Sequence, residues 1–241
     1  MSCISHRPET ATTASRMNRL VPLVALCAGV FAATSGAAPV SPDELNDMSL
    51  VGSARKVDKA VRLIPPVNWH AGAAWRETPI SLLESFHASF RFRLAAGSRP
   101  HQADGIGLVI QTDGPGAIGD AGFGIGYYGL NGVASVVTTW DNNRAGLSLD
   151  GNPFDAKRAP ADLGAAAVVE GGEVVTYDAV NHVLTMRGRL SVDGVEYAIH
   201  DRADVDLAAL LGSDTATIGF TGASGAANAD ERVSEFRFYL D

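Results

Sequence analysis

The stretch that decides the fold of this chain is residues 103–143, ADGIGLVIQTDGPGAIGDAGFGIGYYGLNGVASVVTTWDNN. It opens with an Ala103-Asp104-Gly105 corner, and an apolar segment follows at 106–110. A loop with a glycine at almost every second or third position covers 114–132, and a second apolar segment covers 133–139. Short apolar segments bounded by turn residues are typical of buried strands. The stretch therefore predicts two strands with an open, glycine-rich loop between them.

Polar residues lie at the ends of both predicted strands. Asp104 precedes the first strand, and Trp140-Asp141-Asn142-Asn143 follows the second, so we expect both groups at the same end of a sheet. A carboxylate and an amide bind hydroxyl groups, glycine leaves backbone N–H groups accessible, and an aromatic ring packs on the apolar face of a sugar. These residue types in this order predict a carbohydrate site.

The rest of the chain alternates short strands with turn residues and has no long helical periodicity. The clearest alternation places Phe86, Ala88, Phe90, Phe92 and Leu94 on one face of a strand. An Asp-Gly pair at 193–194 predicts a hairpin turn, and 203–211 is the one helix candidate. The predicted strands are 60–64, 72–75, 86–94, 107–111, 124–128, 133–139, 145–149, 173–178, 183–189, 195–200, 217–221 and 233–239. About a dozen strands in one chain predict an all-β sandwich of two antiparallel sheets.

Three motifs carry a resemblance to a known family. They are the Ala103-Asp104-Gly105 corner, the Ile110-Gln111 pair that ends the first strand, and Ile125-Gly126-Tyr127 in the glycine loop. With these motifs, residues 50–241 resemble the L-type (legume-type) lectin domain, and most of all its bacterial members. The resemblance implies a concanavalin A-like (jelly-roll) sandwich and a carbohydrate-binding protein that is not an enzyme.

The resemblance also implies a role for each matching residue. Asp104 corresponds to an aspartate that accepts hydrogen bonds from two sugar hydroxyls, often beside a cis peptide bond. Gly122 and Phe123 match the loop that donates backbone N–H groups to the sugar. Asn142 matches an asparagine that contacts both sugar and calcium. Trp140 matches an aromatic residue whose carbonyl binds the metal. An aromatic ring, that of Trp140 or of Tyr127, is expected to stack on the sugar.

The chain departs from the family at the strand that carries metal ligands. The family has a Glu-x-Asp pattern there, and this chain has Val136 and Thr138. Arg144 stands where the family has a histidine ligand. Transition metals prefer imidazole and carboxylate ligands, so the sequence predicts that the manganese-type site is absent.

A calcium site is left open by the sequence. Its candidate ligands are Asp141, Asn142 and Asp150, which is a small set for an ion that takes roughly six to eight oxygens. Arg144 is hypothesised to replace the cation by pairing with Asp141 or Asp104. We expect no other cofactor.

The first part of the chain has the features of a signal peptide. Basic residues precede an apolar run at 20–33, and small residues around Ala37 form a cleavage site. The run is shorter than the roughly 20 residues that span a bilayer. The sequence therefore predicts a signal peptide at 1–37, a mobile N-terminal segment at 38–49, the lectin-like domain at 50–241, and a secreted or periplasmic location without membrane insertion.

Charge and cysteine content restrict the partners. Both cysteines, Cys3 and Cys27, lie in the predicted signal peptide, so the mature chain has no disulfide. Loss of that segment removes three arginines and one glutamate and changes the net charge from −8 to −10. A chain this acidic, with no basic cluster in its sequence, argues against nucleic acid and anionic membranes. Glycans or glycoconjugates are the expected partners, and a homo-oligomer is left open.

Catalytic patterns are weak in this sequence. A glycosidase needs paired carboxylates that flank the scissile bond, and the nearest pair, Glu170 and Glu173, is separated by two glycines and is expected at a hairpin tip. No Gly-x-Ser-x-Gly elbow occurs. The alternative to a lectin is therefore a structural or adhesive surface protein that has kept the sandwich and lost the sugar site.

Overall fold

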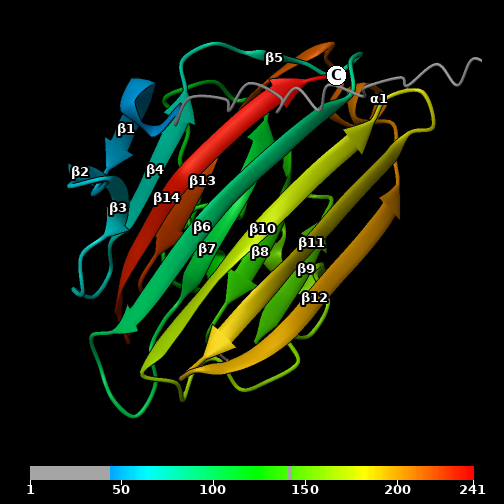
Figure 1. The fold of residues 1–241 in the computed structure, drawn as a ribbon. Helices are drawn as coiled ribbons and strands as arrows, with labels where there is room; N and C mark the ends of the chain where they lie inside the picture. Colours follow the sequence, from blue (N-terminus) through cyan, green and yellow to red (C-terminus); the bar gives the residue numbers. More distant parts are fainter. Residues whose placement is uncertain (1–43, 141–142) are drawn as a thin grey trace, which may run out of the picture. The chain divides into compact units, whose positions relative to one another are not determined.

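The computed structural model describes residues 44–140 and 143–241, which fold into two antiparallel sheets packed face to face (Figure 1). The predicted all-β sandwich is confirmed. The predicted signal peptide, residues 38–43 of the predicted mobile segment, and the candidate ligands Asp141 and Asn142 lie outside the described residues. No helix in the described part of the chain is long and apolar enough to cross a membrane.

The first sheet has the strand order β1-β4-β13-β7-β8-β9, with β5 paired to β13. Its strands are β1 (Met48–Gly52), β4 (Ala71–Arg76), β5 (Ile80–Ser81), β7 (Gly105–Gln111), β8 (Gly132–Thr138), β9 (Arg144–Ser148) and β13 (Thr215–Ala223). The two strands of the opening stretch, β7 and β8, pair directly, with Gly105 opposite Thr138. This pairing brings Asp104 and Thr139 together, since the Thr139 N–H donates to the Asp104 carbonyl at 2.8 Å.

The second sheet has the order β12-β11-β10-β6-β14-β3-β2. Its strands are β2 (Arg55–Val57), β3 (Ala60–Ile64), β6 (Phe86–Ala96), β10 (Val168–Asp178), β11 (Val183–Val192), β12 (Val195–Asp204) and β14 (Ala229–Leu240). The predicted hairpin is confirmed, because β11 and β12 are joined at Asp193-Gly194, both with positive φ. Figure 1 shows β14, β6, β10 and β11 side by side in one layer, with β7, β8 and β9 in the layer behind.

The main core lies between the sheets and follows from side-chain alternation. In β6 the five predicted inward residues are buried, while the residues between them point outward. The ring of Phe90 meets Phe220 of the other sheet at a centroid distance of 5.0 Å, and Phe220 meets Phe236 at 4.9 Å. In β14 a register shift between Ser234 and Arg237 changes the alternation, so Phe236 and Phe238 both face the core.

A second, smaller core covers the outer face of the first sheet, where β7 and β8 are buried along their whole lengths. The glycine-rich loop forms this cover, because Ile125 and Tyr127 pack against Val109 and Val136. The prediction of a strand at 124–128 is therefore wrong. The segment begins at the last residue of a short 3-10 helix, η2 (Gly122–Gly124), and continues as a loop whose apolar residues pack against the first sheet.

Three further expectations are corrected. Residues 44–49 are not a mobile start in this structure: η1 (Glu44–Asp47) and β1 form there, because Leu45 and Met48 are buried in the main core. The helix candidate is reduced to α1 (Leu207–Leu211), capped by Asp206. Glu170 and Glu173 do not form a hairpin tip, since β10 runs through the two glycines between them without a break.

Candidate functional site

Asp104 lies at the end of the first sheet, directly before β7, and its peptide bond to Ala103 is cis. Its backbone is fixed on both sides, because its N–H donates to the Ala223 carbonyl at 2.9 Å and its carbonyl accepts from Thr139. The residue is only 3% exposed. Its Oδ2 atom is buried and has no hydrogen-bond partner among the described residues. A buried acceptor without a donor is uncommon in native proteins and marks this carboxyl group as a candidate for ligand contact.

Two glycines stand next to the Asp104 carboxyl group. A Cβ added to Gly122 would lie 3.9 Å from Oδ2, and one added to Gly225 would lie 3.0 Å from it. The Gly122 N–H donates to the Ser224 carbonyl at 3.1 Å, which ties the glycine loop to the segment after β13. The expectation that this N–H is free to bind a sugar is therefore wrong. Gly122 lies beside the Asp104 carboxyl group without a side chain, and its backbone has φ 66°.

A second buried carboxyl group lies behind Asp104. Glu231 of β14 accepts a hydrogen bond from the Gly105 N–H at 2.9 Å and so connects the two sheets below the corner. Gly105 has φ 133°, and a Cβ there would lie 2.2 Å from the Val137 carbonyl oxygen, so only glycine fits. Gly105 is therefore needed for the backbone conformation of the corner. Glu231 is a site residue that the sequence pattern does not indicate.

Burial sets the protonation of both groups. It raises the pKa of Asp104 from 3.8 to about 7, because the charged form is desolvated. The nearby Gly225 N–H acts in the opposite direction, but it donates its hydrogen bond to Ala227. Burial also raises the pKa of Glu231 well above its usual value, and the charge of Asp104 adds to this rise. The Asp104 carboxyl group therefore changes charge near neutral pH, and Glu231 holds its proton more tightly than a free glutamate does.

Exposed aromatic rings flank this corner. Phe123 of η2 is 57% exposed and its ring lies 5.4 Å from that of Phe154. Trp140 is 38% exposed and meets His101 edge-on at 6.0 Å, at the rim of a cavity of about 530 Å³. Tyr127 is fully buried, and its hydroxyl group donates to the Gly132 carbonyl at 2.9 Å. The expectation that Tyr127 stacks on a sugar is therefore wrong.

A third exposed aromatic residue, Trp69, was missed in the sequence. It is 69% exposed, has φ 60°, and its N–H donates to the Gly225 carbonyl at 3.2 Å. A bulky residue rarely adopts this left-handed backbone, and such conformations are frequent at functional sites. The segment around Trp69 is held by the Asn68 and Asn228 side chains, which hydrogen-bond to each other. Trp69 could not be found from the sequence, because it follows a Pro-Pro pair far from the opening stretch.

The three residues at the expected metal-ligand positions, Val136, Thr138 and Arg144, have other contacts in the structure. Val136 is fully buried in the smaller core. The Thr138 hydroxyl group accepts from the Arg144 N–H at 3.0 Å, and the Arg144 guanidinium donates to the Ala156 carbonyl at 3.1 Å. A guanidinium repels a cation, and the hydrocarbon of Val136 offers it no ligand.

The calcium and arginine hypotheses are tested only in part. Arg144 forms no ion pair with Asp104 in the described residues, so that half of the substitution hypothesis is wrong. Its pairing with Asp141 lies outside the described residues, as do two of the three calcium candidates. The third candidate, Asp150, interacts with Asp155. Burial is the main cause that raises the pKa of Asp150, and the interaction with Asp155 raises it further. Among the described residues, no group of three or more acidic, histidine or cysteine side chains is placed so that it could hold a metal ion.

Glu173, one of the two carboxylates considered above as a glycosidase pair, is buried in the main core. It accepts a hydrogen bond from the Ser135 hydroxyl group at 2.6 Å. Burial raises its pKa from 4.5 to about 7. The folded state therefore binds this proton more tightly than the unfolded state, and the stability it contributes is lost as pH rises through about 7. In the wild type, ionisation of Glu173 is expected to lower the unfolding free energy by about 2–3 kcal/mol between about pH 5 and pH 8.5. In Glu173→Gln this contribution to the pH dependence should be absent.

Urea unfolding at the two pH values measures this effect. Glu170→Gln is the matched control, because Glu170 lies in the same strand with its side chain 53% exposed on the outer face. A pH dependence that is equal in the wild type and in Glu173→Gln would show that Glu173 does not titrate in the folded core.

Comparison with known proteins gives the fold. No protein-family model and no curated protein matches the chain. A solved structure of the lectin from Bauhinia forficata in complex with GalNAc matches with a TM-score of 0.69 and 22% identity, over 83% of this chain and 97% of that one. The chain has the legume-lectin fold.

Two other solved structures with this fold are similar to the chain. The metal-free form of lectin I-B4 from Griffonia simplicifolia matches with a TM-score of 0.67 and 20% identity, over 81% of this chain and 94% of that one. Arcelin-5, a lectin-like defence protein from Phaseolus vulgaris, matches with a TM-score of 0.67 and 19% identity, over 81% and 92% of the two chains. Likeness at this level of identity concerns the fold, so function must be argued from the site.

Proposed function

We propose that this chain is an exported, non-catalytic carbohydrate-binding protein whose site is the corner around Asp104. The observation that carries the proposal is the buried Oδ2 atom of Asp104, which lacks a donor within the described residues and stands at the end of a legume-lectin sandwich. A sugar hydroxyl group is a donor of the right size, and it would offset the cost of burying this acceptor. The lectins among the similar structures include one in complex with GalNAc and one complexed with galactose.

The neighbouring residues suit such a ligand. Gly122 and Gly225 carry no side chains, so only their backbone atoms lie over the carboxyl group. Trp69, Phe123 and Trp140 provide exposed rings for the apolar face of a sugar. Asn142 is retained in the proposal as a second polar contact, although it lies outside the described residues. A few hydrogen bonds and one stacking contact correspond to weak binding, with Kd in the range of roughly micromolar to millimolar.

The proposed binding does not use a transition metal. Val136, Thr138 and Arg144 have packing and hydrogen-bonding roles in the structure, so the corner is held by backbone hydrogen bonds and by Glu231. We therefore expect glycan binding to be unchanged when manganese is absent.

The pKa of Asp104 predicts the pH dependence of this binding. An ionised carboxylate accepts hydrogen bonds more strongly than the protonated acid, and burial raises the pKa of Asp104 to about 7. With that value the ionised fraction increases about tenfold between about pH 6 and pH 8. We expect glycan affinity to rise by a similar factor over this range. A glycan array followed by titration of the strongest neutral glycan measures this, with and without a chelator; affinity that is constant or falls with pH would contradict the role of Asp104.

A second candidate function is a structural or adhesive surface protein without a sugar site. It is favoured by the low exposure of Asp104 and by the internal use of the Gly122 N–H. The glycan array separates the two candidates. A folded protein that binds no glycan at any pH tested would support the structural role and overturn the proposal above.

A further inference from the structure

The outer face of the second sheet carries arginines that the sequence does not show as a cluster. Arg91 and Arg93 alternate with inward residues on β6, Arg187 and Arg189 do so on β11, and Arg237 lies on β14. All five side chains are exposed. The expectation of no basic cluster is therefore wrong for this face, because residues almost 150 positions apart in the chain become neighbours when strands pair.

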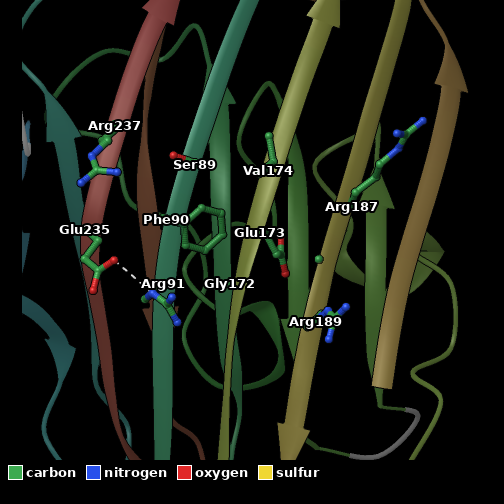
Figure 2. A pocket seen from close by; sticks show the side chains of 11 residues that line it. Ser89, Phe90, Arg91, Gly172, Glu173, Val174, Arg187, Arg189, Glu235 and Arg237 are labelled. Atoms are coloured by element: carbon green, nitrogen blue, oxygen red, sulfur yellow. Dashed lines mark hydrogen bonds and ion pairs between the residues drawn. The ribbon is translucent and has the colours of Figure 1, made fainter. Parts of the chain in front are cut away.

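Strand register places a glycine between two of these arginines. Gly172 of β10 pairs with Arg91 of β6 on one side and with Arg189 of β11 on the other. It forms the floor of a groove of about 520 Å³, which Figure 2 shows with Arg91, Arg189 and Arg187 around it. A glycine inside a strand weakens the strand and often marks a place where a ligand approaches the backbone closely. A Cβ at Gly172 would have only ordinary contacts, the shortest at 3.4 Å, so packing does not require glycine here.

Charge pairing leaves part of the groove uncompensated. Arg91 pairs with Glu235 at 3.0 Å, which is the dashed contact in Figure 2. Arg187, Arg189 and Arg237 form no ion pair with any residue that the structure describes. Three unpaired guanidinium groups beside one groove, in a chain of net charge −8, form a local site for anions.

The groove continues along the strands. A neighbouring hollow of about 480 Å³ shares Arg91, Gly172 and Arg189 with it and adds Arg93 and Ser234. Equivalent positions on one face of a strand repeat every roughly 6.8 Å, so the guanidinium groups form a ladder along an extended path. Carboxylates lie within this path, including Glu170 and Glu196 in the second hollow.

We propose that this groove binds an extended acidic glycan, a chain whose sugars carry carboxylate or sulfate groups. Guanidinium groups recognise both oxyanions with paired hydrogen bonds, and the interspersed carboxylates accept from sugar hydroxyl groups. A nucleic acid fits less well, because its phosphates would meet Glu170 and Glu235, and because the exposed groove residues include no aromatic ring for base stacking. The site is separate from Asp104, which lies on the other sheet.

Binding of dextran sulfate, polygalacturonate, neutral dextran and single-stranded oligothymidylate to the full chain tests the proposal. We expect one or both acidic glycans to bind, at least tenfold more tightly than neutral dextran and oligothymidylate, with affinity that falls as salt rises. The acidic glycan that binds more tightly identifies the oxyanion. Gly172→Glu places a carboxylate between Arg91 and Arg189, so it should abolish this binding while leaving unfolding by urea unchanged or shifted to higher urea.

Two further variants locate the site. Arg189→Gln should weaken binding at least fivefold, whereas Arg202→Gln should not, because Arg202 is already paired with Asp204 at 2.6 Å on the same sheet. Asp104→Asn should leave acidic-glycan binding unchanged, so the two proposed sites can fail independently. Equal affinity for oligothymidylate, no binding to either acidic glycan, or full binding by a folded Gly172→Glu variant would overturn the proposal.

Discussion

Asp104→Asn is expected to weaken the binding of a neutral glycan about 100-fold while the protein stays folded. The substitution keeps the shape of the side chain, replaces a charged acceptor by an amide, and places two N–H donors where hydroxyl donors are needed. Loss of one hydrogen bond to a charged group costs roughly 1.5–3 kcal/mol, and the remaining bond is weaker because its amide acceptor is neutral, so together they correspond to about a 100-fold change in Kd.

The same substitution is expected to increase stability at high pH. Burial raises the pKa of Asp104 to about 7, so the wild type loses stability as this group ionises in the folded state. Asparagine does not ionise, and the variant should therefore unfold at a higher temperature than the wild type at about pH 8. Stability gained together with binding lost is the expected signature of a functional residue.

Asp58→Asn is the matched control for this variant. Asp58 is exposed at the turn between β2 and β3 and has φ 53°, a conformation that asparagine accepts. It should change neither glycan affinity nor stability. If Asp104→Asn binds the glycan as tightly as the wild type, the corner is not the sugar site.

Phe220→Ala is expected to cost about 3–5 kcal/mol of unfolding free energy. Phe220 is fully buried on β13 and contacts the rings of Phe90 and Phe236 from the second sheet. Truncation leaves a cavity at the centre of the interface between the sheets, and it removes two edge-on ring contacts. A loss of this size is a large part of the stability of a typical domain.

Urea unfolding measures the effect of Phe220→Ala as a lower midpoint with an unchanged slope. Leu83→Ala is the control, because Leu83 is 62% exposed and should change stability by less than about 0.5 kcal/mol. A cost below about 1 kcal/mol for Phe220→Ala would show that the two sheets do not depend on this cluster.

Local pattern was sufficient to predict most of the fold. Phe86, Ala88 and Phe90 show the alternation of a half-buried strand, and β6 has that pattern in the structure. The Asp193-Gly194 pair predicted the hairpin correctly, because its turn type depends on two adjacent residues. The prediction of a strand at 124–128 was wrong, because the buried residues of this segment belong to a loop that packs on the first sheet.

The candidate site was only partly predictable. Asp104 was found because its neighbours in the chain define the corner. Trp69, Gly225 and Glu231 join it through contacts between distant segments, and no local signal marks them. The groove around Gly172 could not be predicted either, because strand pairing and not sequence proximity brings its arginines together.

The most direct test of the central claim is to map the binding of a neutral glycan by NMR amide shifts on this 25.1 kDa chain. We predict that the largest changes fall on the amides of Trp69, Asp104, Phe123 and Gly225, and that the outer face of the second sheet is unaffected. Changes confined to that outer face, around Gly172, or an absence of any change at saturating glycan, would contradict the assignment of the sugar site to Asp104.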